Sequence, residues 1–390
     1  MNRRIFLATA AMGGLTVGPH SAAQQSDLPE PIRNLRPMLD GVVPIGEPER
    51  AARREKARRL MAQQKLDAVY LENGSSMYYF TGKRTAGQAV VLSANGKSDA
   101  VWTASDPATV AQTLRGMGIA TGKVGLEEQV RFATFDGLRK EIPAVECVSG
   151  TPVVAGCRVI KSAAELALLQ RANEITIQAY KAALATLREG MTQRELSANI
   201  AAAFRALGTG GGAMAIFGKY TAFPHGSIQP QQLREGDMVL IDDGCSVESY
   251  QSDITRTTVF GKPTKRQREV WDLERKAQDA ALAAARPGAT CESVDAAARK
   301  VITDAGFGPG YKTPGLPHRT GHGIGLDGHE WTYLVKGNKT RLEPGMCFSD
   351  EPTIVIYGEF GVRLEDCMYI TPGGARMFTK QSPAIDQPFG

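Results

Sequence analysis

Two segments in the C-terminal half of the chain carry acidic residues where the surrounding pattern predicts buried β-strands. The first, 238–257, leads from an apolar run into Asp242, passes through a polar turn and returns through Asp253. If this hairpin is symmetric, its centre lies between Val247 and Glu248, and the two aspartates face each other. Directly opposed residues on paired strands have Cβ atoms about 4.5–5.5 Å apart. Two carboxylates at that distance repel each other unless positive charge lies between them.

A second acidic hairpin is predicted further along the chain. Glu351 and Glu365 are equidistant from Gly358, so these carboxylates also face each other. Between the hairpins, the glycine-rich segment 320–325 supplies an imidazole at His322. Four carboxylates and one imidazole carry about four negative charges, which two divalent cations would balance, and paired metals of this kind occur in hydrolases. The sequence therefore predicts a dinuclear metal site, and oxygen-rich ligation with one imidazole favours Mn²⁺, Co²⁺ or Zn²⁺.

The two hairpins follow two similar helical regions. In each region a long helical pattern ends at a glycine, and a second, shorter helix then ends at another glycine. With an offset of 98 residues, Gly190 matches Gly288 and Gly208 matches Gly306. Each region later reaches a His-Gly pair and an acid-bearing hairpin. We interpret this shared order as an internal duplication whose two halves bring their carboxylate pairs together.

The residues before the duplicated region predict a separate, smaller domain. Short apolar strands alternate with amphipathic helices, including one over 47–64, and no chemistry is concentrated there. We predict an α/β domain over 24–155 and a catalytic domain over 156–390.

The first residues resemble a bacterial twin-arginine signal peptide. Arg3 and Arg4 precede a short, mildly apolar stretch that ends at Gly18, and small residues at 21–23 offer a cleavage site. The alternative is a frayed N-terminus in which the two arginines have no role. The order of the three parts favours a signal peptide over 1–23, and we expect export to the periplasm.

Charge and hydropathy exclude some classes of partner. The net charge of +5 is small, and no basic helix is apparent, so we expect no nucleic-acid partner. No apolar run reaches the roughly 20 residues that cross a bilayer, so we expect no membrane association once a signal peptide is removed. The scattered cysteines favour buried free thiols, and a disulfide between Cys347 and Cys367 stays open.

With these motifs in this order, region 156–390 resembles the pita-bread metallopeptidases, which include aminopeptidase P, prolidase and methionine aminopeptidase. The matching motifs are Asp242-x-Gly244, Ser252-Asp253-Ile254-Thr255-Arg256-Thr257, Gly321-His322-Gly323-Ile324-Gly325, His329-Glu330, Glu351-Pro352 and Gly361-Val362-Arg363-Leu364-Glu365-Asp366. Region 24–155, with Tyr79-Phe80-Thr81-Gly82, resembles the N-terminal domain of creatinase and of the proline-specific peptidases. The resemblance implies an α+β chain in which a small creatinase-like α/β domain precedes a pita-bread domain of two duplicated α/β halves.

The resemblance also implies roles for the motif residues. The implied ligands of two divalent metal ions, with Mn²⁺ expected first, are Asp242, Asp253, His322, Glu351 and Glu365, and Asp253 and Glu365 bridge both ions. Glu351 further matches the acceptor of a proton from the attacking water. His225, His329 and Arg363 match the groups that hold the substrate and stabilise the tetrahedral intermediate. One departure lies at 331–333, Trp-Thr-Tyr, where the family often has a proline nearby.

The activity that the resemblance implies is that of an Xaa-Pro aminopeptidase, which releases the first residue from peptides with proline second. The alternatives are an Xaa-Pro dipeptidase (prolidase), a metal-independent creatinase-like C–N hydrolase and a non-catalytic binding module. Competent donors at all five ligand positions disfavour the last two. We expect a peptide substrate as partner and, from relatives with this layout, a homo-oligomer (dimer or tetramer).

Overall fold

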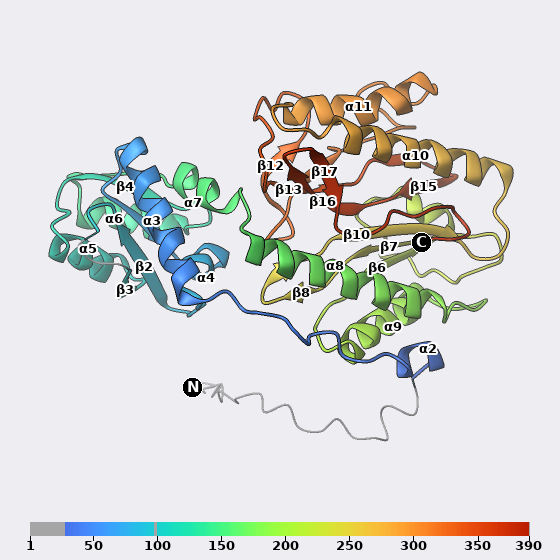
Figure 1. The fold of residues 1–390 in the computed structure, drawn as a ribbon, viewed down its shortest axis with the longest axis horizontal. Helices are drawn as coiled ribbons and strands as arrows, with labels where there is room; N and C mark the ends of the chain where they lie inside the picture. Colours follow the sequence, from blue (N-terminus) through green and yellow to red (C-terminus); the bar gives the residue numbers. More distant parts are fainter. Residues whose placement is uncertain (1–27, 97–99, 390) are drawn as a thin grey trace, which may run out of the picture.

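The computed structural model describes residues 28–96 and 100–389, and Figure 1 shows them as two parts, a smaller one in blue to teal and a larger one from green to red. The predicted signal peptide, 1–23, lies outside the described residues. Helix α7, Thr151–Arg158, spans the predicted domain boundary between 155 and 156, and that boundary stays a prediction. In the part of the chain that is described, no helix is long and apolar enough to cross a membrane.

The smaller part is built around a mixed five-stranded sheet. Its order is β3-β2-β1-β4-β5, with β1–β4 and β4–β5 parallel and the other pairs antiparallel. Its elements are α3 Glu47–Gln64, β1 Ala68–Leu71, α4 Ser75–Thr81, β2 Gln88–Ser93, β3 Val101–Ala104, α5 Pro107–Gly116, β4 Gly122–Leu126, α6 Phe132–Glu141, β5 Val145–Ser149 and α7. Alternate side chains of β1 enter different cores: Val69 and Leu71 one, Ala68 and Tyr70 the other. Both faces are therefore covered, which explains why β1 is apolar throughout.

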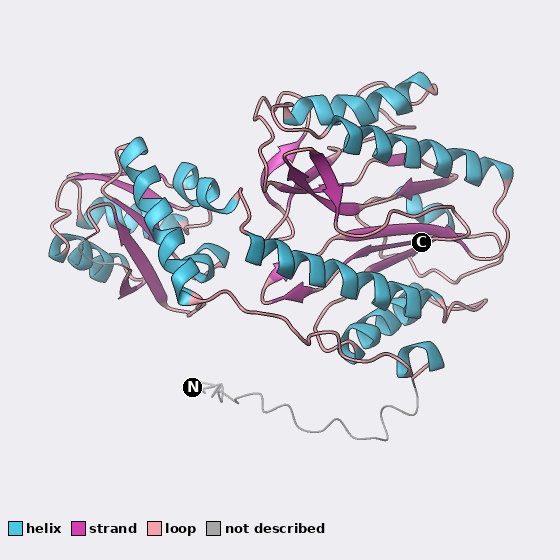
Figure 2. Ribbon diagram, viewed as in Figure 1, coloured by secondary structure: helices cyan, strands magenta, loops and turns pink. Residues whose placement is uncertain are grey.

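The larger part encloses its strands between two pairs of helices. Figure 2, read with the labels of Figure 1, shows α8 and α9 on one side of the strands and α10 and α11 on the other. The sheets are β10-β7-β6, β12-β11-β13-β16-β17, β14-β15 and β8-β9. The elements are α2 Glu30–Arg33, α8 Ala163–Leu184, α9 Gln193–Ala206, β6 Met214–Phe217, η1 Gly218–Ala222, β7 Met238–Asp243, β8 Ser246–Val247, β9 Tyr250–Gln251, β10 Ile254–Val259, α10 Lys265–Ala284, α11 Cys291–Asp304, β11 Gly321–Gly323, β12 Glu330–Leu334, β13 Cys347–Asp350, β14 Thr353–Ile356, β15 Phe360–Arg363, β16 Asp366–Thr371 and β17 Gly374–Met377.

The predicted duplication is visible in the backbone. Gly190 and Gly288 have φ angles of 76° and 84°, a left-handed conformation that glycine adopts without steric cost. Each donates its N–H over 2.8 Å to a leucine carbonyl in its own half, from Gly190 to Leu233 and from Gly288 to Leu342. The two halves therefore repeat the same helix–glycine–helix junction, fixed in the same way.

The first acidic hairpin has a different register from the predicted one. Thr255, and not Asp253, lies opposite Asp242. The turn is centred on Glu248 and Ser249, whose φ angles of 48° and 70° fit a two-residue turn of the kind that matches strand twist. This turn moves the hairpin centre by one residue, so the predicted pairing of Asp242 with Asp253 is wrong. Both aspartates still lie at the same end of the hairpin.

The second acidic hairpin has the predicted register. Thr353 pairs with Arg363, and Asp350 pairs with Asp366, across a turn centred on Gly358. Glu351 and Glu365 lie between these two pairs, so the prediction that they face each other is confirmed.

Cys347 and Cys367, for which the sequence left a disulfide as an open alternative, do not lie opposite each other in the sheet. Cys347 pairs with Tyr369, and Cys367 pairs with Ser349, on the neighbouring strands β13 and β16. Both are buried free thiols.

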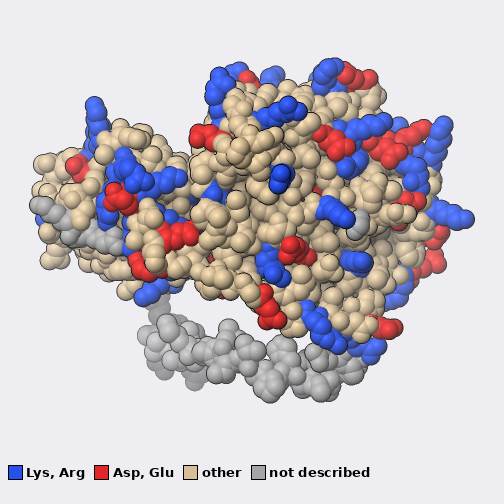
Figure 3. All heavy atoms as spheres, viewed as in Figure 1, with Lys and Arg blue, Asp and Glu red and all other residues tan. Residues whose placement is uncertain are grey.

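Charged side chains of both signs share the surface. On the face drawn in Figure 3, Lys and Arg lie among Asp and Glu and do not gather in one area. Some form ion pairs four residues apart on a helix, such as Lys140 with Asp136 and Lys300 with Asp304. This face therefore offers no single-signed area to a charged partner.

A fully buried ion pair joins the two halves of the larger part. Arg256 of β10 contacts Asp366 of β16 with an Nη2–Oδ1 distance of 2.6 Å, and neither residue is exposed to solvent. Arg256 also donates to the carbonyl of Glu365 at 2.9 Å, and Gln278 donates to Asp366 at 3.2 Å. A buried charge costs several kcal/mol unless it is paired and hydrogen-bonded, and these contacts meet that need.

Replacement of Arg256 with Met should destabilise the protein by about 3–5 kcal/mol, because Asp366 would stay buried without its partner. Urea denaturation followed by tryptophan fluorescence would measure the loss. The matched control is Arg268→Met, which removes an exposed pair with Asp386 and should cost at most about 1 kcal/mol. Equal unfolding midpoints for the two variants would contradict the structural role of the buried pair.

Candidate metal centre

The five predicted metal ligands come from strand ends in both halves of the larger part. Asp242 lies at the end of β7, and Asp253 lies just before β10. His322 is the central residue of β11, Glu351 follows β13, and Glu365 lies between β15 and β16. These strand ends meet because the halves are bonded to each other directly. Reciprocal backbone hydrogen bonds of 3.3 and 3.1 Å join Thr255 to Glu365.

The structure brings all five side chains together. The Nε2 atom of His322 lies 3.2 Å from a carboxylate oxygen of Glu351, 3.6 Å from Asp253 and 3.9 Å from Glu365. Donor atoms of His322, Glu351 and Glu365 lie within 4.8 Å of one another, as do those of Asp242, Asp253 and Glu365. The two donor groups share Glu365, an arrangement that suits two neighbouring metal ions.

The charges of this cluster require positive counter-charge. Burial and the neighbouring carboxylates raise the pKa values of Asp253 and Glu365 well above the ordinary range. Burial also raises the pKa of Glu351 to about 7, against the lowering effect of Arg363. Oε1 of Glu365 is buried and has no hydrogen-bond partner in the part of the chain that is described. Divalent cations would satisfy this oxygen and offset the repulsion, so the residues present fit a metal centre.

His322 has the tautomer that a metal ligand needs. Its Nδ1 lies 3.1 Å from the carbonyl oxygen of Gly323, which can only accept a hydrogen bond, so Nδ1 carries the proton. Burial and the nearby His329 lower its pKa well below the ordinary value, so the imidazole is neutral. The lone pair of Nε2 therefore points at the carboxylates. Such a backbone contact to the other ring nitrogen is typical of ligating histidines.

Arg363, for which the resemblance implies a contact to the substrate, pairs with Asp242 in the structure. Its Nη2 pairs with Oδ2 of Asp242, its Nε lies 3.1 Å from the hydroxyl of Thr255, and its Nη1 donates to the carbonyl of Pro224 at 3.2 Å. The Thr255 hydroxyl lies 2.6 Å from carboxylate oxygens of both Asp242 and Glu365. Arg363 and Thr255 thus fix the orientation of carboxylates from both halves. Thr255 lies beside Asp242 because the two residues are opposite each other in the hairpin. The predicted register placed Asp253 there, so this role of Thr255 was not predicted.

The two other predicted histidines lie at the edge of the cluster. The ring centre of His329 lies 3.9 Å from that of His322. Nδ1 of His329 lies 3.1 Å from Nη2 of Arg319, which can only donate, so Nδ1 accepts and Nε2 carries the proton. Burial and the Arg319 charge lower the pKa of His329. His225 is exposed in the loop after η1, near enough for its charge to lower the pKa values of His329 and His318.

Two further residues at the centre were not predicted. His318 is half-buried with its Nε2 atom 3.0 Å from the hydroxyl of Thr353, and desolvation lowers its pKa to about 3. Arg319 contacts His329 directly. Both lie within five residues of His322, and this closeness in sequence could have identified them as residues of the site.

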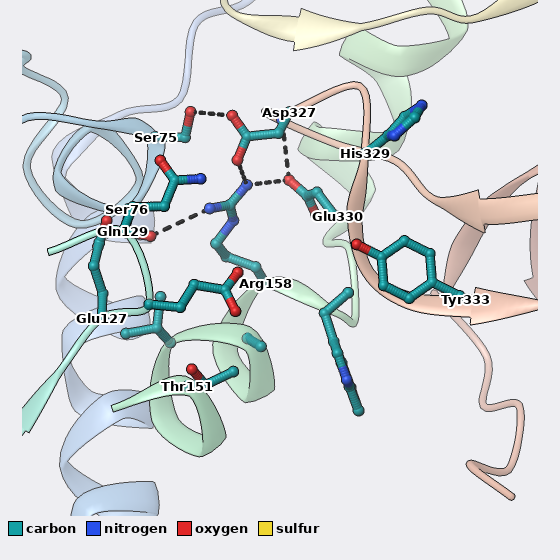
Figure 4. Close-up of a pocket in the computed structure, with 14 residues that line it drawn as sticks. Ser75, Ser76, Glu127, Gln129, Thr151, Arg158, Asp327, His329, Glu330 and Tyr333 are labelled. Atoms are coloured by element: carbon teal, nitrogen blue, oxygen red, sulfur yellow. Dashed lines mark hydrogen bonds and ion pairs between the residues drawn. The ribbon is translucent and has the colours of Figure 1, made fainter. Parts of the chain in front are cut away.

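The segment that carries His329 is fixed to the smaller part of the molecule. Figure 4 shows Arg158 pointing at Asp327 and Glu330 beside a pocket between the two parts. Arg158 lies 2.7 Å from Asp327 and also pairs with Glu330, and Lys161 lies 2.9 Å from Glu330. Burial alone would raise the pKa of Glu330, but the two cations lower it to about 2. The carboxylate directly after His329 is thus held ionised between two cations.

A second contact between the parts involves the turn of the first acidic hairpin. The hydroxyl of Tyr78 donates to the carbonyl of Glu248 at 3.4 Å, and Arg84 donates to the hydroxyl of Ser249 at 2.9 Å. The hairpin that carries Asp242 and Asp253 therefore ends against the smaller part.

Comparison with known proteins matches both parts of the chain. Residues 167–372 match the model of metallopeptidase family M24, and residues 53–113 match the creatinase/prolidase N-terminal domain. An Xaa-Pro dipeptidase from Pyrococcus furiosus is 29% identical over 345 residues, which cover 84% of this chain and 97% of that protein.

Solved structures extend the likeness to the whole fold. The dipeptidase PepE from Mycobacterium ulcerans is 30% identical with a TM-score of 0.78, over 87% of this chain and 97% of that one. An X-Pro aminopeptidase from Thermotoga maritima is 26% identical with a TM-score of 0.75, over 85% and 98%. Both confirm the predicted α+β architecture. With more than half of its length matched by one family model, this chain belongs to metallopeptidase family M24, a family of pita-bread hydrolases that depend on two metal ions.

Proposed function

We propose that the protein is an Xaa-Pro dipeptidase, a prolidase, whose activity depends on two divalent metal ions. The observation that carries the peptidase chemistry is the convergence of five donor side chains on one point between the halves. Similarity to an Xaa-Pro dipeptidase over 97% of that protein's length supports the substrate class. The motifs alone favoured an Xaa-Pro aminopeptidase, which becomes the alternative. An X-Pro aminopeptidase has the same fold, so the fold does not separate the two activities.

We assign the metal-binding role to Asp242, Asp253, His322, Glu351 and Glu365, with Mn²⁺ as the expected ion and Co²⁺ or Zn²⁺ as alternatives. When bound, such ions lower the pKa of a water molecule and polarise the scissile carbonyl. Arg363 and Thr255 keep the ligand carboxylates oriented. A creatinase-like hydrolase without metal, or a binding module, would have no use for this complete donor set.

Protein groups around the cluster supply the proton transfers. Glu351, one of the proposed ligands, would accept the proton of the attacking water and pass it to the leaving nitrogen. His329 presents its protonated Nε2 as a donor to the negative charge that develops on the carbonyl oxygen. His225, exposed in the adjoining loop, is the proposed group that holds the peptide. These roles are part of the proposal.

The first test compares an Xaa-Pro dipeptide with an Xaa-Pro-Yaa tripeptide after chelation of the metals and resupply with Mn²⁺. We expect no turnover without metal, recovery with Mn²⁺, and clear preference for the dipeptide. A dipeptide whose second residue is not proline serves as the control and should be a poor substrate. Preference for the tripeptide would make the protein an Xaa-Pro aminopeptidase. No turnover of either peptide with metal bound would contradict both activities.

A second test separates a ligand carboxylate from its neighbour in the sequence. Asp242→Asn should lower activity at least roughly 100-fold, because changes to groups that merely support ligands already cost 10–100-fold. Asp243→Asn is the matched control, since within the described part of the chain the Asp243 side chain accepts only from the next backbone N–H, over 2.9 Å. Atomic absorption should show less bound metal in Asp242→Asn alone. Equal metal content and activity in the two variants would remove Asp242 from the ligand set.

We also propose that the protein is exported to the periplasm, on the strength of its N-terminal sequence. Replacement of Arg3 and Arg4 with Lys should keep the precursor in the cytoplasm, since twin-arginine transport reads that pair. Cell fractionation and N-terminal sequencing of the mature protein measure the outcome. Unchanged periplasmic recovery of the variant would exclude that route.

We further propose that the protein is a homo-oligomer, and light scattering would measure its mass in solution.

A further inference from the structure

Arg319 is a cation beside the metal centre that has no carboxylate partner. One nitrogen lies 3.1 Å from Nδ1 of His329, and the guanidinium carbon lies 5.1 Å from the ring centre of Tyr333. Its Nε is buried, and no group in residues 28–96 and 100–389 accepts a hydrogen bond from it. No ion pair forms between Arg319 and any Asp or Glu of those residues. A guanidinium with unused donors is therefore held at the edge of the site.

The other arginines of this region are neutralised by carboxylates. They pair as Arg363 with Asp242, Arg158 with Asp327 and Glu330, Arg256 with Asp366, and Arg299 with Asp295. Among the described residues of this region, Arg319 is thus an arginine whose charge is available to an incoming anion.

A dipeptide substrate brings such an anion to this place. In an Xaa-Pro dipeptide the terminal carboxylate is attached to the residue whose nitrogen forms the scissile bond, so it always lies a few bonds from the reacting carbonyl. Arg319 contacts His329, whose ring stacks on His322, so the guanidinium lies one side chain away from the proposed ligands. A longer peptide has an uncharged amide in the same position.

We infer that Arg319, held over the ring of Tyr333, binds the terminal carboxylate of the substrate and so selects dipeptides over longer peptides. The inference rests on the proposed function and names the group that determines its substrate length. The planar guanidinium can donate two parallel hydrogen bonds to a carboxylate. Because it is already held over an aromatic ring, it loses less conformational freedom when the carboxylate binds. Tyr333 belongs to segment 331–333, where this chain departs from the pattern of its family.

The test pairs Arg319→Gln with two substrates that differ only in the charge of the terminus. These are Ala-Pro and its C-terminal amide, compared with the Mn²⁺-loaded enzyme. Arg319→Gln should raise KM for Ala-Pro roughly 10- to 100-fold, the range for one charge-assisted contact, and change KM for the amide by less than about twofold. Arg319→Lys keeps the charge without the planar fork and should recover part of the loss. Arg266→Gln, which breaks an exposed pair with Glu359, should change neither KM.

Two outcomes would overturn the inference. A loss of equal size on Ala-Pro and on its amide would mean that Arg319 acts on the site as a whole. No change on either substrate would mean that the carboxylate binds elsewhere. If the wild type turns over neither compound, the proposed function fails, and calorimetric binding of Ala-Pro and its amide still tests Arg319. Equal affinity of the wild type for the two compounds would then overturn the inference alone.

Discussion

Repulsion among buried carboxylates is the constraint on which the larger domain depends. Asp253, Glu351 and Glu365 all lie within 3.9 Å of one histidine nitrogen. Carboxylates so placed stay ionised only where positive charge reaches them, and the protein supplies part of that charge by pairing Arg363 with Asp242. The negative charge that Arg363 does not balance is the physical reason for a metal centre. Because each half contributes carboxylates, neither half could assemble the centre without the other.

Local symmetry was the part of the site that the sequence could predict. Glu351 and Glu365 were correctly paired because the turn around Gly358 is compact and the strands on both sides continue one register. The first hairpin shifted because its turn places Glu248 and Ser249 at positive φ. Neither residue type signals that conformation as glycine or asparagine would.

The sequence could not predict the contacts between segments that lie far apart in the chain. Arg158 and Glu330 are 172 residues apart, and no local pattern connects them. The same holds for the ion pair of Arg363 with Asp242, which joins residues 121 positions apart in the sequence. Such pairings depend on how the halves and the smaller domain pack. The helix over 47–64, by contrast, is a local element, and the structure gives it the bounds that the sequence predicts.

Two of the contacts between the domains share a property. Each involves a segment that also carries site residues: the hairpin of Asp242 and Asp253 ends against Tyr78 and Arg84, and the loop of His329 pairs with Arg158. The smaller domain thus contacts two segments that both lead to the proposed metal ligands. Its packing therefore bears on the active site from two directions, although it contributes none of the five donor side chains.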